Sequence, residues 1–482
     1  GIYVVSGATP AIDASVAANT INGGAPTTAE SVGILISGAG SNPVISGNSI
    51  NGGGGGTASF GINVQSDADP TIQNNTSISG GTGGTTYGIY ATGAGTNPTI
   101  GGAGNGNTLI TGGAATAGSS FAINVLAGAS PTITANAEIN GGTSSTGNTE
   151  AIHIDNSTVS ITGNLLNGGA TSVAGNDAIG INAVGTSGGS IERNRIFAGT
   201  ALAGGNSTIA INLPGSGTFS VNNNLVSGGQ GTNGSSGLYL AGSATVTVRN
   251  NTIHTGTAGT ASRGVYLVSN NSVTVQNNLI VCTGAAATNI IGFEEAGGAT
   301  EPSVFRNNNV SDCSTALYRD NNATNITGTS DALDTGEGAG TFASYGNISI
   351  APSFVDFDGA DNTSSTSDDF AGTNWDMAAG GVPTNQAQGG LDLSGSGITT
   401  DIAGNARTNL GGGQNDGPTN SGANGFTIGA FEDETPALSA PATMYSRASG
   451  NYNDPNTWSG SACGGAQPAT FASPVAATNV TI

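Results

Sequence analysis

Apolar and polar residues alternate in short runs along most of the chain, and these runs recur at a nearly constant interval. Residues 273–280 read VTVQNNLI, in which Val275 precedes Asn278 by three positions and Ile280 follows it by two. The same phrase returns as VTVRNNTI over residues 246–253. Alternation with a period of two, bounded by Gly, Asn, Ser and Pro, predicts β-strands, whereas no window shows the 3.6-residue period of a helix.

The runs belong to a repeat in which most units are 27–30 residues long. Each unit carries three strand-like runs, of which FGINVQS (60–66) is typical, and closes with a double glycine such as SISGG. Short strands repeating at this period indicate a solenoid. We therefore predict an all-β fold, a right-handed parallel β-helix of about eleven coils that stack at about 4.8 Å. The insertions after each double glycine are expected to be loops along one edge of the rod.

An asparagine occupies one position of nearly every unit. Its members are Asn48, Asn75, Asn136, Asn164, Asn194, Asn224, Asn251, Asn278 and Asn308, with Asn107 in an expanded copy. At a bend between strands a residue must leave the β region, and asparagine tolerates the left-handed conformation well. Stacked amides can also hydrogen-bond along the rod. Because aliphatic residues flank these positions, we predict a structural ladder rather than an outward row of carbohydrate-binding amides.

The repeat weakens towards the C-terminus, and composition divides the chain into four parts. We predict coils over 1–313, an irregular β capping segment over 314–432, a linker over 433–443, and the start of a further module over 444–482. Both ends of the sequence read as the interior of structural units. We therefore expect a piece of a longer surface protein.

The three cysteines leave the pairing open. Cys282 and Cys313 occupy nearly the same phase of adjacent units, so they form either a disulfide or two neighbouring buried hydrophobes. Cys463 has no evident partner.

Charge is scarce, acidic and uneven. The 482 residues include 30 acids, eight arginines and no lysine, for a net charge of −22, of which −17 falls in residues 291–482. Nucleic-acid binding needs clustered Lys and Arg, and is therefore not expected. No run reaches the length of a membrane span, so we expect no membrane insertion in this segment. A divalent cation is the partner that such a charge balance attracts.

Five aspartates fall within one short stretch, FVDFDGADNTSSTSDDF (354–370). They are Asp356, Asp358, Asp361, Asp368 and Asp369. Carboxylates spaced along a glycine-containing loop can converge on one hard cation, and Ca²⁺ takes six to eight oxygen ligands. The glutamate that ends an EF-hand loop is absent. The stretch predicts either a Ca²⁺ site or a solvated acidic turn.

This stretch, with DIAGNAR (401–407) and TIGAFE (427–432), resembles the closing segment of secreted bacterial right-handed parallel β-helix repeat proteins of the choice-of-anchor type. The matching positions are Asp401, Gly404, Arg407, Gly429, Ala430 and Glu432. VPTNQAQGG replaces the phrase that usually lies between. The resemblance implies a secreted, extracellular or cell-surface protein, and it implies no particular activity.

Candidate catalytic groups are few. In EAIHIDN, alternation places His153 and Asp155 on one face within hydrogen-bond reach, near Glu150, and the next unit brings Asp177 close. A glycosidase needs two carboxylates about 5–9.5 Å apart. A lyase needs a strong base, which IERNRIF could supply, but no acidic cluster accompanies it. The groups in IERNRIF are Glu192, Arg193 and Arg195.

These observations predict a non-enzymatic extracellular structural or adhesive protein, a β-helix stalk or filament-forming element. The partners that we expect are a second copy of the chain, joined end to end, and a cell-surface or extracellular glycan. The alternative is a β-helix that binds or degrades polysaccharide as a lyase or glycosidase. Flat threonine-rich β-helix faces can bind ice, but the threonines show no regular file in the sequence, so this role is not expected.

Overall fold

The computed structural model describes most of the chain up to residue 432 and three short strands beyond it. The described residues before that point are 1–13, 18–204, 206–269, 272–282, 284, 287–297, 300–322, 324–327, 343–363, 365–370, 375, 390–407 and 426–432. The chain divides into two compact units, residues 1–432 and residues 433–482. Cys463 lies outside the described residues.

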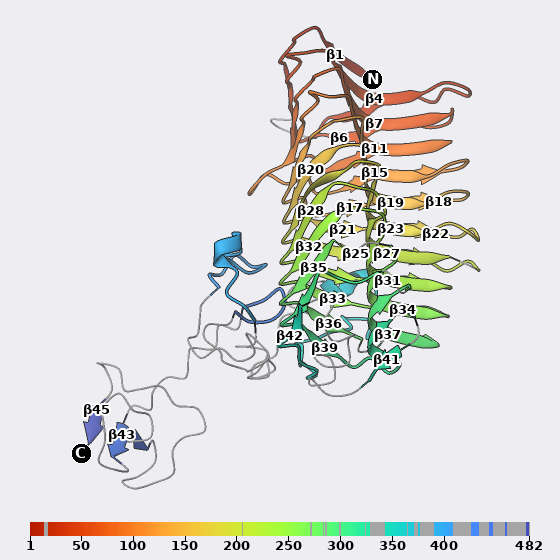
Figure 1. Ribbon diagram of the computed structural model, residues 1–482. Coiled ribbons are helices and arrows are strands. Elements are labelled where there is room, and N and C mark those ends of the chain that lie inside the picture. The colour runs from red at the N-terminus through yellow and green to blue at the C-terminus, as the bar shows by residue number, and fades with distance from the viewer. Residues whose placement is uncertain are drawn as a thin grey trace. The chain divides into compact units, whose positions relative to one another are not determined.

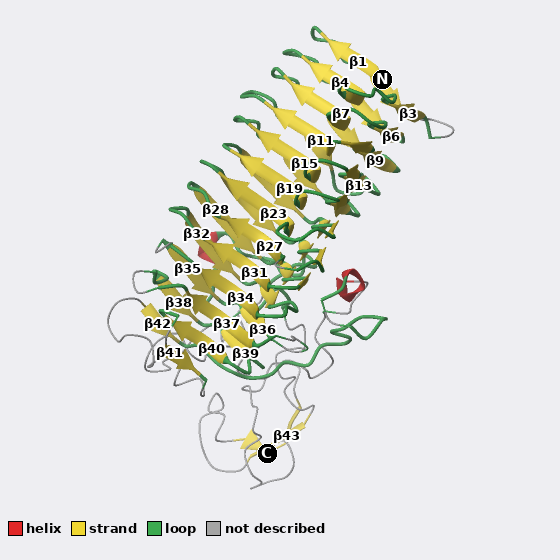
Figure 2. Cartoon of the chain, turned by 90° about the vertical axis from the view of Figure 1, so that its right-hand side faces the viewer, coloured by secondary structure: helices red, strands yellow, loops and turns green. Residues whose placement is uncertain are grey.

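The first unit is a right-handed parallel β-helix of about eleven coils, whose strands stack one above another (Figure 1). Each coil contributes one strand to each of three long parallel sheets, here called A, B and C. Because neighbouring strands come from successive coils, each coil contacts chiefly the coil before it and the coil after it. The side view shows the long strands of sheet A in one continuous stack (Figure 2).

Sheet A has 13 strands, and all pair in parallel except the last. They are β1 (Ile2–Val5), β4 (Ser31–Ser37), β7 (Ala58–Gln65), β11 (Thr85–Thr92), β15 (Ser120–Leu126), β19 (Thr149–Asp155), β23 (Ala178–Val184), β27 (Ser207–Leu213), β31 (Gly234–Leu240), β34 (Ala261–Leu267), β37 (Asn289–Glu295), β40 (Ala316–Asp320) and β41 (Thr324–Ile326).

Sheet B has 12 strands. They are β2 (Ala11–Asp13), β5 (Val44–Ser46), β8 (Thr71–Gln73), β12 (Thr99–Gly101), β16 (Thr132–Thr134), β20 (Thr158–Thr162), β24 (Gly188–Glu192), β28 (Thr218–Asn222), β32 (Thr245–Arg249), β35 (Val273–Gln276), β38 (Val304–Arg306) and β42 (Ala343–Tyr345).

Sheet C has 11 strands. They are β3 (Thr20–Asn22), β6 (Ser49–Asn51), β9 (Ser77–Ser79), β13 (Ile110–Thr111), β17 (Ile139–Asn140), β21 (Leu165–Asn167), β25 (Arg195–Phe197), β29 (Leu225–Ser227), β33 (Thr252–His254), β36 (Leu279–Val281) and β39 (Asn309–Ser311).

A fourth sheet, D, forms where the sequence predicted only loops. Its six strands are β10 (Thr82–Gly83), β14 (Ala114–Ala115), β18 (Thr143–Ser144), β22 (Ala170–Thr171), β26 (Thr200–Ala201) and β30 (Gln230–Gly231). Five of the six follow a double glycine, and β26 follows Ala198-Gly199. The second glycine of the pair has a positive φ, +76° at Gly81, where a Cβ would lie 2.1 Å from the Gly53 carbonyl oxygen. Only glycine fits this close approach of successive coils.

The remaining elements are small. Two 3-10 helices, η1 (Ser367–Phe370) and η2 (Ser394–Ser396), lie in the segment that follows the coils. In the second unit, β43 (Thr443–Ser446) pairs with β44 (Trp458–Ser459) and β45 (Asn479–Thr481). Within the described part of the chain, no helix is long and apolar enough to cross a membrane.

The core consists of files of aliphatic side chains that repeat from coil to coil. In sheet A one file runs through Ile34, Ile62, Ile89, Ile123, Ile152, Ile181, Ile211, Leu238, Val265 and Phe293, all fully buried. Burying one such side chain stabilises the fold by about 1.5–3 kcal/mol. The same residue thus packs between its equivalents above and below, which explains the period of the sequence.

The asparagines lie in one file at the corner between sheets B and C, and all of them except the first, Asn19, are buried. Each side-chain Nδ2 donates to Oδ1 of the next member at 2.9–3.3 Å, starting at Asn19 and ending at Asn347. The backbone N–H of Asn136 also donates to Asn164 Oδ1 at 2.9 Å, and this bond recurs along the file. The asparagine ladder therefore also holds the corner of each coil in place.

The predicted left-handed conformation belongs to the preceding residue, not to the ladder asparagine, and that expectation was wrong. Positive φ occurs at Asn74, Asn223 and Asn250, each directly before a ladder asparagine, and at Gly163 in the same place. The bend therefore falls one residue earlier. This leaves the ladder side chain directed inward, where its amide replaces water for the backbone groups of the corner.

The coils continue past residue 313, which corrects the boundary expected there. β40 pairs in parallel with β37, and β42 pairs in parallel with β38. Asn347 then accepts the hydrogen bond of Asn308 at 3.1 Å. The sequence does not show this last repeat because a long insertion separates β38 from β42.

Cys282 and Cys313 form a disulfide, with a Cα–Cα distance of 5.0 Å. This decides between the two alternatives left open by the sequence. The bond joins two successive coils close to the end of the β-helix.

Candidate functional site

The outer face of sheet A carries two adjacent columns of side chains, which we call the sheet-A groove. The first column is Phe60, Tyr87, Phe121, Glu150, Ile179, Ile209, Ser236 and Arg263. The second, three residues later in each coil, is Asn63, Tyr90, Asn124, His153, Asn182, Asn212, Tyr239, Tyr266, Glu294 and Arg319. Strand register alone brings these residues into line.

One end of the groove is aromatic. The ring of Tyr87 stacks between Phe60 at 4.8 Å and Phe121 at 5.4 Å, and Tyr90 meets it edge-on at 5.2 Å. Such ring pairs contribute about 0.5–1.5 kcal/mol beyond their burial. Burial raises the pKa of Tyr87 to about 12. These rings therefore pack chiefly against one another, as part of the wall of the groove.

The middle of the groove holds a carboxylate–imidazole pair. Glu150 Oε2 lies 2.7 Å from His153 Nδ1, and Glu150 Oε1 accepts from Asn182 Nδ2 at 3.1 Å. Burial lowers the pKa of His153, but the hydrogen bond to Glu150 and the charge of that residue outweigh it, so the pKa is raised. Asp155, which the sequence analysis paired with His153, instead accepts a hydrogen bond from Asn156 Nδ2.

Alternation does place His153 and Asp155 on the same outward side of β19, since Ile152 and Ile154 are fully buried, but the predicted hydrogen bond between them is replaced by the one to Glu150. Between Glu150 and Ile152 the pairing with β15 skips Ala151, so positions 150 and 153 come to lie on the same side. Strict alternation would have turned Glu150 to the side opposite His153.

The other end of the groove is a hollow of about 540 Å³. It is lined in part by Asp177, Asn212, Tyr239, Arg263 and Tyr266. The Tyr239 and Tyr266 rings meet edge-on at 5.5 Å, and the Arg263 guanidinium lies 4.2 Å above the Tyr266 ring. The sequence gives no signal for this hollow, since its residues come from four different coils.

The charged groups around the hollow are partnered. Glu294 forms ion pairs with Arg263 and with Arg319, the latter at 3.1 Å. Asp177 Oδ1 accepts from the Ser207 N–H at 2.8 Å, and burial raises the pKa of this carboxyl. Each of these carboxylates therefore has a local donor.

The residues of IERNRIF lie elsewhere. Glu192 and Arg193 line a separate hollow of about 310 Å³, beside Thr399 and Thr400 of the C-terminal segment. Among the described residues, neither Arg193 nor Arg195 forms an ion pair. The structure thus does not join them to the Glu150 pair.

Aspartate side chains of the acidic stretch accept hydrogen bonds from backbone N–H groups of the same stretch. Asp369 Oδ2 accepts from the N–H groups of Ser365 at 2.6 Å and Thr366 at 3.2 Å, and burial raises its pKa to about 7. Asp368 Oδ2 accepts from the Asp361 N–H at 3.2 Å. No three acidic, His or Cys side chains gather as a metal-binding group in the described residues. The Ca²⁺ site at Asp356, Asp358, Asp361, Asp368 and Asp369 stays a prediction.

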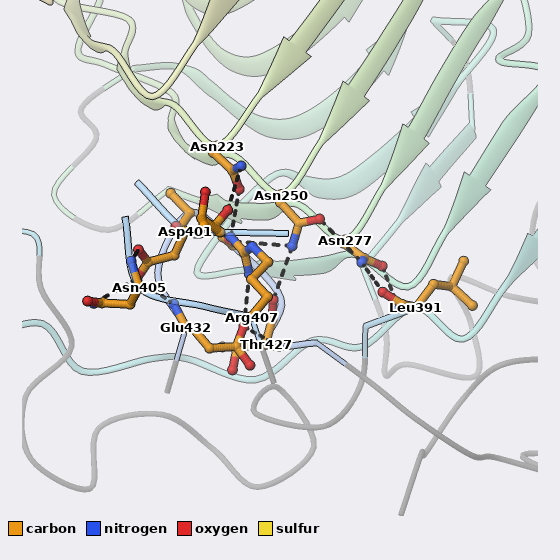
Figure 3. Close-up of polar contacts among 12 residues, drawn as sticks. Asn223, Asn250, Asn277, Leu391, Asp401, Asn405, Arg407, Thr427 and Glu432 are labelled. Atoms are coloured by element: carbon orange, nitrogen blue, oxygen red, sulfur yellow. Dashed lines mark hydrogen bonds and ion pairs between the residues drawn. The ribbon is translucent and has the colours of Figure 1, made fainter. Parts of the chain in front are cut away.

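The matching positions of the closing segment come together as a buried clasp (Figure 3). Arg407 donates to Glu432 Oε2 at 3.1 Å and to Asn223 Oδ1 at 2.7 Å. Asp401 Oδ2 accepts from the Glu432 N–H at 3.2 Å. Burial lowers the pKa of Arg407, and the charges of Glu432 and Asp401 oppose this shift.

The clasp fastens the segment to the coils through the left-handed asparagines. Asn223 Nδ2 donates to the Thr400 carbonyl at 3.0 Å, Asn250 Nδ2 to the Thr427 carbonyl at 3.2 Å, and Asn277 exchanges two 2.8 Å bonds with Leu391. Figure 3 shows these three asparagines in a row along the coil corner. The sequence signal was the doublet Asn-Asn in successive repeats, of which only the second residue was interpreted.

The comparisons with known proteins agree with this fold. The family model described as right handed beta helix region matches residues 204–353. None of the curated proteins and none of the solved structures matches the chain. The match thus supports the fold seen in residues 1–432, a right-handed parallel β-helix.

Proposed function

We propose that this chain is a non-enzymatic, extracellular β-helix element that adheres to surfaces by binding glycans along the sheet-A groove. The observation that carries the proposal is the hollow around Tyr239 and Tyr266. It combines two aromatic rings with amide, hydroxyl and guanidinium groups on a rigid sheet. Aromatic faces and a few placed polar groups are what a sugar-binding site requires.

The state of the acidic groups supports binding rather than catalysis. A hydrolase needs one carboxyl that donates a proton and a second that acts as nucleophile or base. In the groove, Glu150 is held by His153 and Asn182, and Glu294 by two arginines. Such groups serve to order the side chains around them.

The test is a glycan array probed with the full chain, followed by titration calorimetry on each hit. Tyr239→Ala and Tyr266→Ala should each weaken binding by about tenfold, the effect of losing about 1–1.5 kcal/mol of ring contact. Leu202→Ala, which removes a side chain that is 63% exposed and is not among those lining the hollow, is the matched control. Unchanged affinity in both tyrosine variants would show that the glycan does not bind at the hollow.

The same hits should be incubated with the protein and assayed for new reducing ends and for unsaturated products. If the unsubstituted chain releases either product and Glu150→Gln does not, the protein is a polysaccharide-degrading enzyme and the proposal is wrong. End-to-end self-association, the other part of the structural role, is tested by light scattering over a range of protein concentrations.

A further inference from the structure

The outer face of sheet B carries a continuous file of hydroxyl side chains. Strand register aligns Thr71, Thr99, Thr132, Ser160, Ser190, Ser220, Thr247 and Thr274 as direct neighbours from coil to coil. The threonines alone show no regular file in the sequence, whereas the structure aligns threonines and serines in one file, with Ser160, Ser190 and Ser220 between Thr132 and Thr247. Their sequence separations vary from 27 to 33 residues, because loops of different length connect the strands, and this variation hides the file.

The file faces outward. The residues that alternate with it, such as Ile72, Ile100 and Ile133, are fully buried in the core. No member of the file is buried, and Thr99 and Thr132 are exposed. The strands that carry it stack along one side of the β-helix, where β20, β28, β32 and β35 are seen one above another (Figure 1).

Further hydroxyl groups widen the file in the middle of the sheet. β16 presents Thr132 and Thr134, and β20 presents Thr158, Ser160 and Thr162. The outer column is interrupted on β24 by Gly188 and resumes on β28 and β32 with Thr218 and Thr245, which pair directly. The face is therefore two or three hydroxyl side chains wide on β16, β20, β28 and β32, and one wide on β24, where Ser190 keeps the file continuous.

Neither a charged nor an aromatic residue belongs to the file. In the neighbouring column, charge is absent from Ser46 to Thr162, between Asp13 at the N-terminal end and Glu192. This sets sheet B apart from the sheet-A groove, which contains rings and ion pairs, and from sheet C, where the C-terminal segment packs on part of the face. Three faces of one rod thus present three different chemistries.

We propose that the hydroxyl face of sheet B is a binding site for ice, that is, for a lattice of ordered water. Strands in a sheet repeat every 4.7–4.9 Å, so the hydroxyl groups form a regular array that can hydrogen-bond to a crystalline ligand at many points. Each threonine adds a methyl group beside its hydroxyl, and its β-branched side chain loses little freedom on binding.

Ordered water fits this face better than a sugar does. A single hydroxyl contact is weak, but a rigid array forms many such contacts at the same time, as in multivalent binding. A dissolved glycan would be held by aromatic rings, and the file has none. A crystal offers a large repeating surface, which matches a face that repeats in every coil.

The test uses the full chain and its purified variants. We expect thermal hysteresis in a nanolitre osmometer and partition of the protein into a growing ice hemisphere. Thr132→Tyr and Thr99→Tyr place a ring in the middle of the face and should abolish most of the hysteresis. Thr108→Tyr, at an exposed position outside sheet B, is the matched control and should leave it unchanged.

Circular dichroism melting separates loss of binding from loss of fold, since all three substitutions lie at exposed positions and should keep the melting temperature. Absence of hysteresis and of ice partition in the unsubstituted chain would overturn the proposal. So would equal activity in all three variants, or binding to crystalline cellulose or chitin without binding to ice.

Discussion

The N-terminal and C-terminal coils share one inner structure and differ in what they show to the outside. In the N-terminal coils the outward residues of sheet C are small and polar, such as Ser49 in one column and Ser79 in the other. In the later coils the equivalent positions hold Phe197, Leu225 and Leu279, all buried. The inward files and the asparagine ladder are the same in both. Inward positions therefore specify the coil, and outward positions specify what packs on it.

The later coils are covered by the segment that follows them in the chain. Phe197 and Leu225 pack with Phe370, Trp375 and Ala430 in one apolar cluster. A second cluster joins Leu279 and Val281 to Ile348 and Ile428. Burial of each large side chain contributes about 1.5–3 kcal/mol, so the covered coils gain a second, outer core that the N-terminal coils lack.

The largest expected effect comes from opening the clasp. Arg407→Ala leaves Glu432 buried without its ion-pair partner, which should cost about 3–5 kcal/mol and release the C-terminal segment. Limited proteolysis with mass spectrometry should then show new cleavage between residues 390 and 432, while the N-terminal coils stay intact.

Arg249→Ala is the control for this variant, because Arg249 is half-buried on the outer face of sheet B and its guanidinium donates to Gln276 Oε1 at 3.1 Å rather than to a buried carboxylate. An Arg407→Ala cleavage pattern identical to that of Arg249→Ala would show that the clasp does not hold the segment.

The ladder offers a sharper form of the comparison, because it runs through both regions. Asn136→Ala, in the uncovered coils, and Asn251→Ala, in the covered coils, each remove an amide that bonds to the next coil at 2.9–3.0 Å. Each should cost about 1–3 kcal/mol, since buried backbone groups lose their partner. Urea denaturation followed by circular dichroism gives both values, with the exposed Asn97→Ala as control. A much smaller loss of unfolding free energy for Asn251→Ala than for Asn136→Ala would mean that the covering segment, not the ladder, stabilises the covered coil.

The pH dependence of stability tests two buried carboxyl groups of the C-terminal region. Burial raises the pKa of Glu295 from 4.5 to about 7, and that of Asp369 from 3.8 to about 7, and both lie in the C-terminal half. Between these values the folded state binds more protons than the unfolded state, so stability falls as pH rises from about 4.5 to about 7.

The melting temperature should therefore decrease over this range. Glu295→Gln, which keeps an oxygen for the Tyr318 hydroxyl, should flatten the decrease. A melting temperature that rises over the same range would contradict the assignment.

The smallest expected effect concerns calcium. If the aspartates of residues 354–370 bind Ca²⁺, added calcium should raise the melting temperature by a few degrees, since a ligand bound only to the folded state adds about 2.7 kcal/mol at one hundred times its Kd. Asp361→Asn should reduce the rise, and magnesium at the same concentration is the ionic-strength control. Equal melting temperatures in calcium and in EDTA would leave the stretch a solvated acidic turn.

Much of the fold could be read from the sequence because the rules that govern it are local. Alternation fixes which residues of a strand face inward, and the recurring asparagine marks the corner of each coil. The candidate groove was less accessible. Glu150 and His153 were singled out, but their contact depends on a bend at Ala151 that skips one residue in the pairing. The hollow at Tyr239 and Tyr266 showed no signal, because its residues are far apart in the chain.

By itself, the sequence determined that this chain forms a parallel β-helix with an asparagine ladder, since each coil repeats the same inward residues and buries them between identical neighbours. Only the tertiary structure decided which outward residues meet. Loops of different length connect the strands, so the hydroxyl file of sheet B and the hollow of sheet A follow from strand register rather than from sequence spacing. The clasp likewise needs the folded chain, because Arg407 and Asn223 are 184 residues apart.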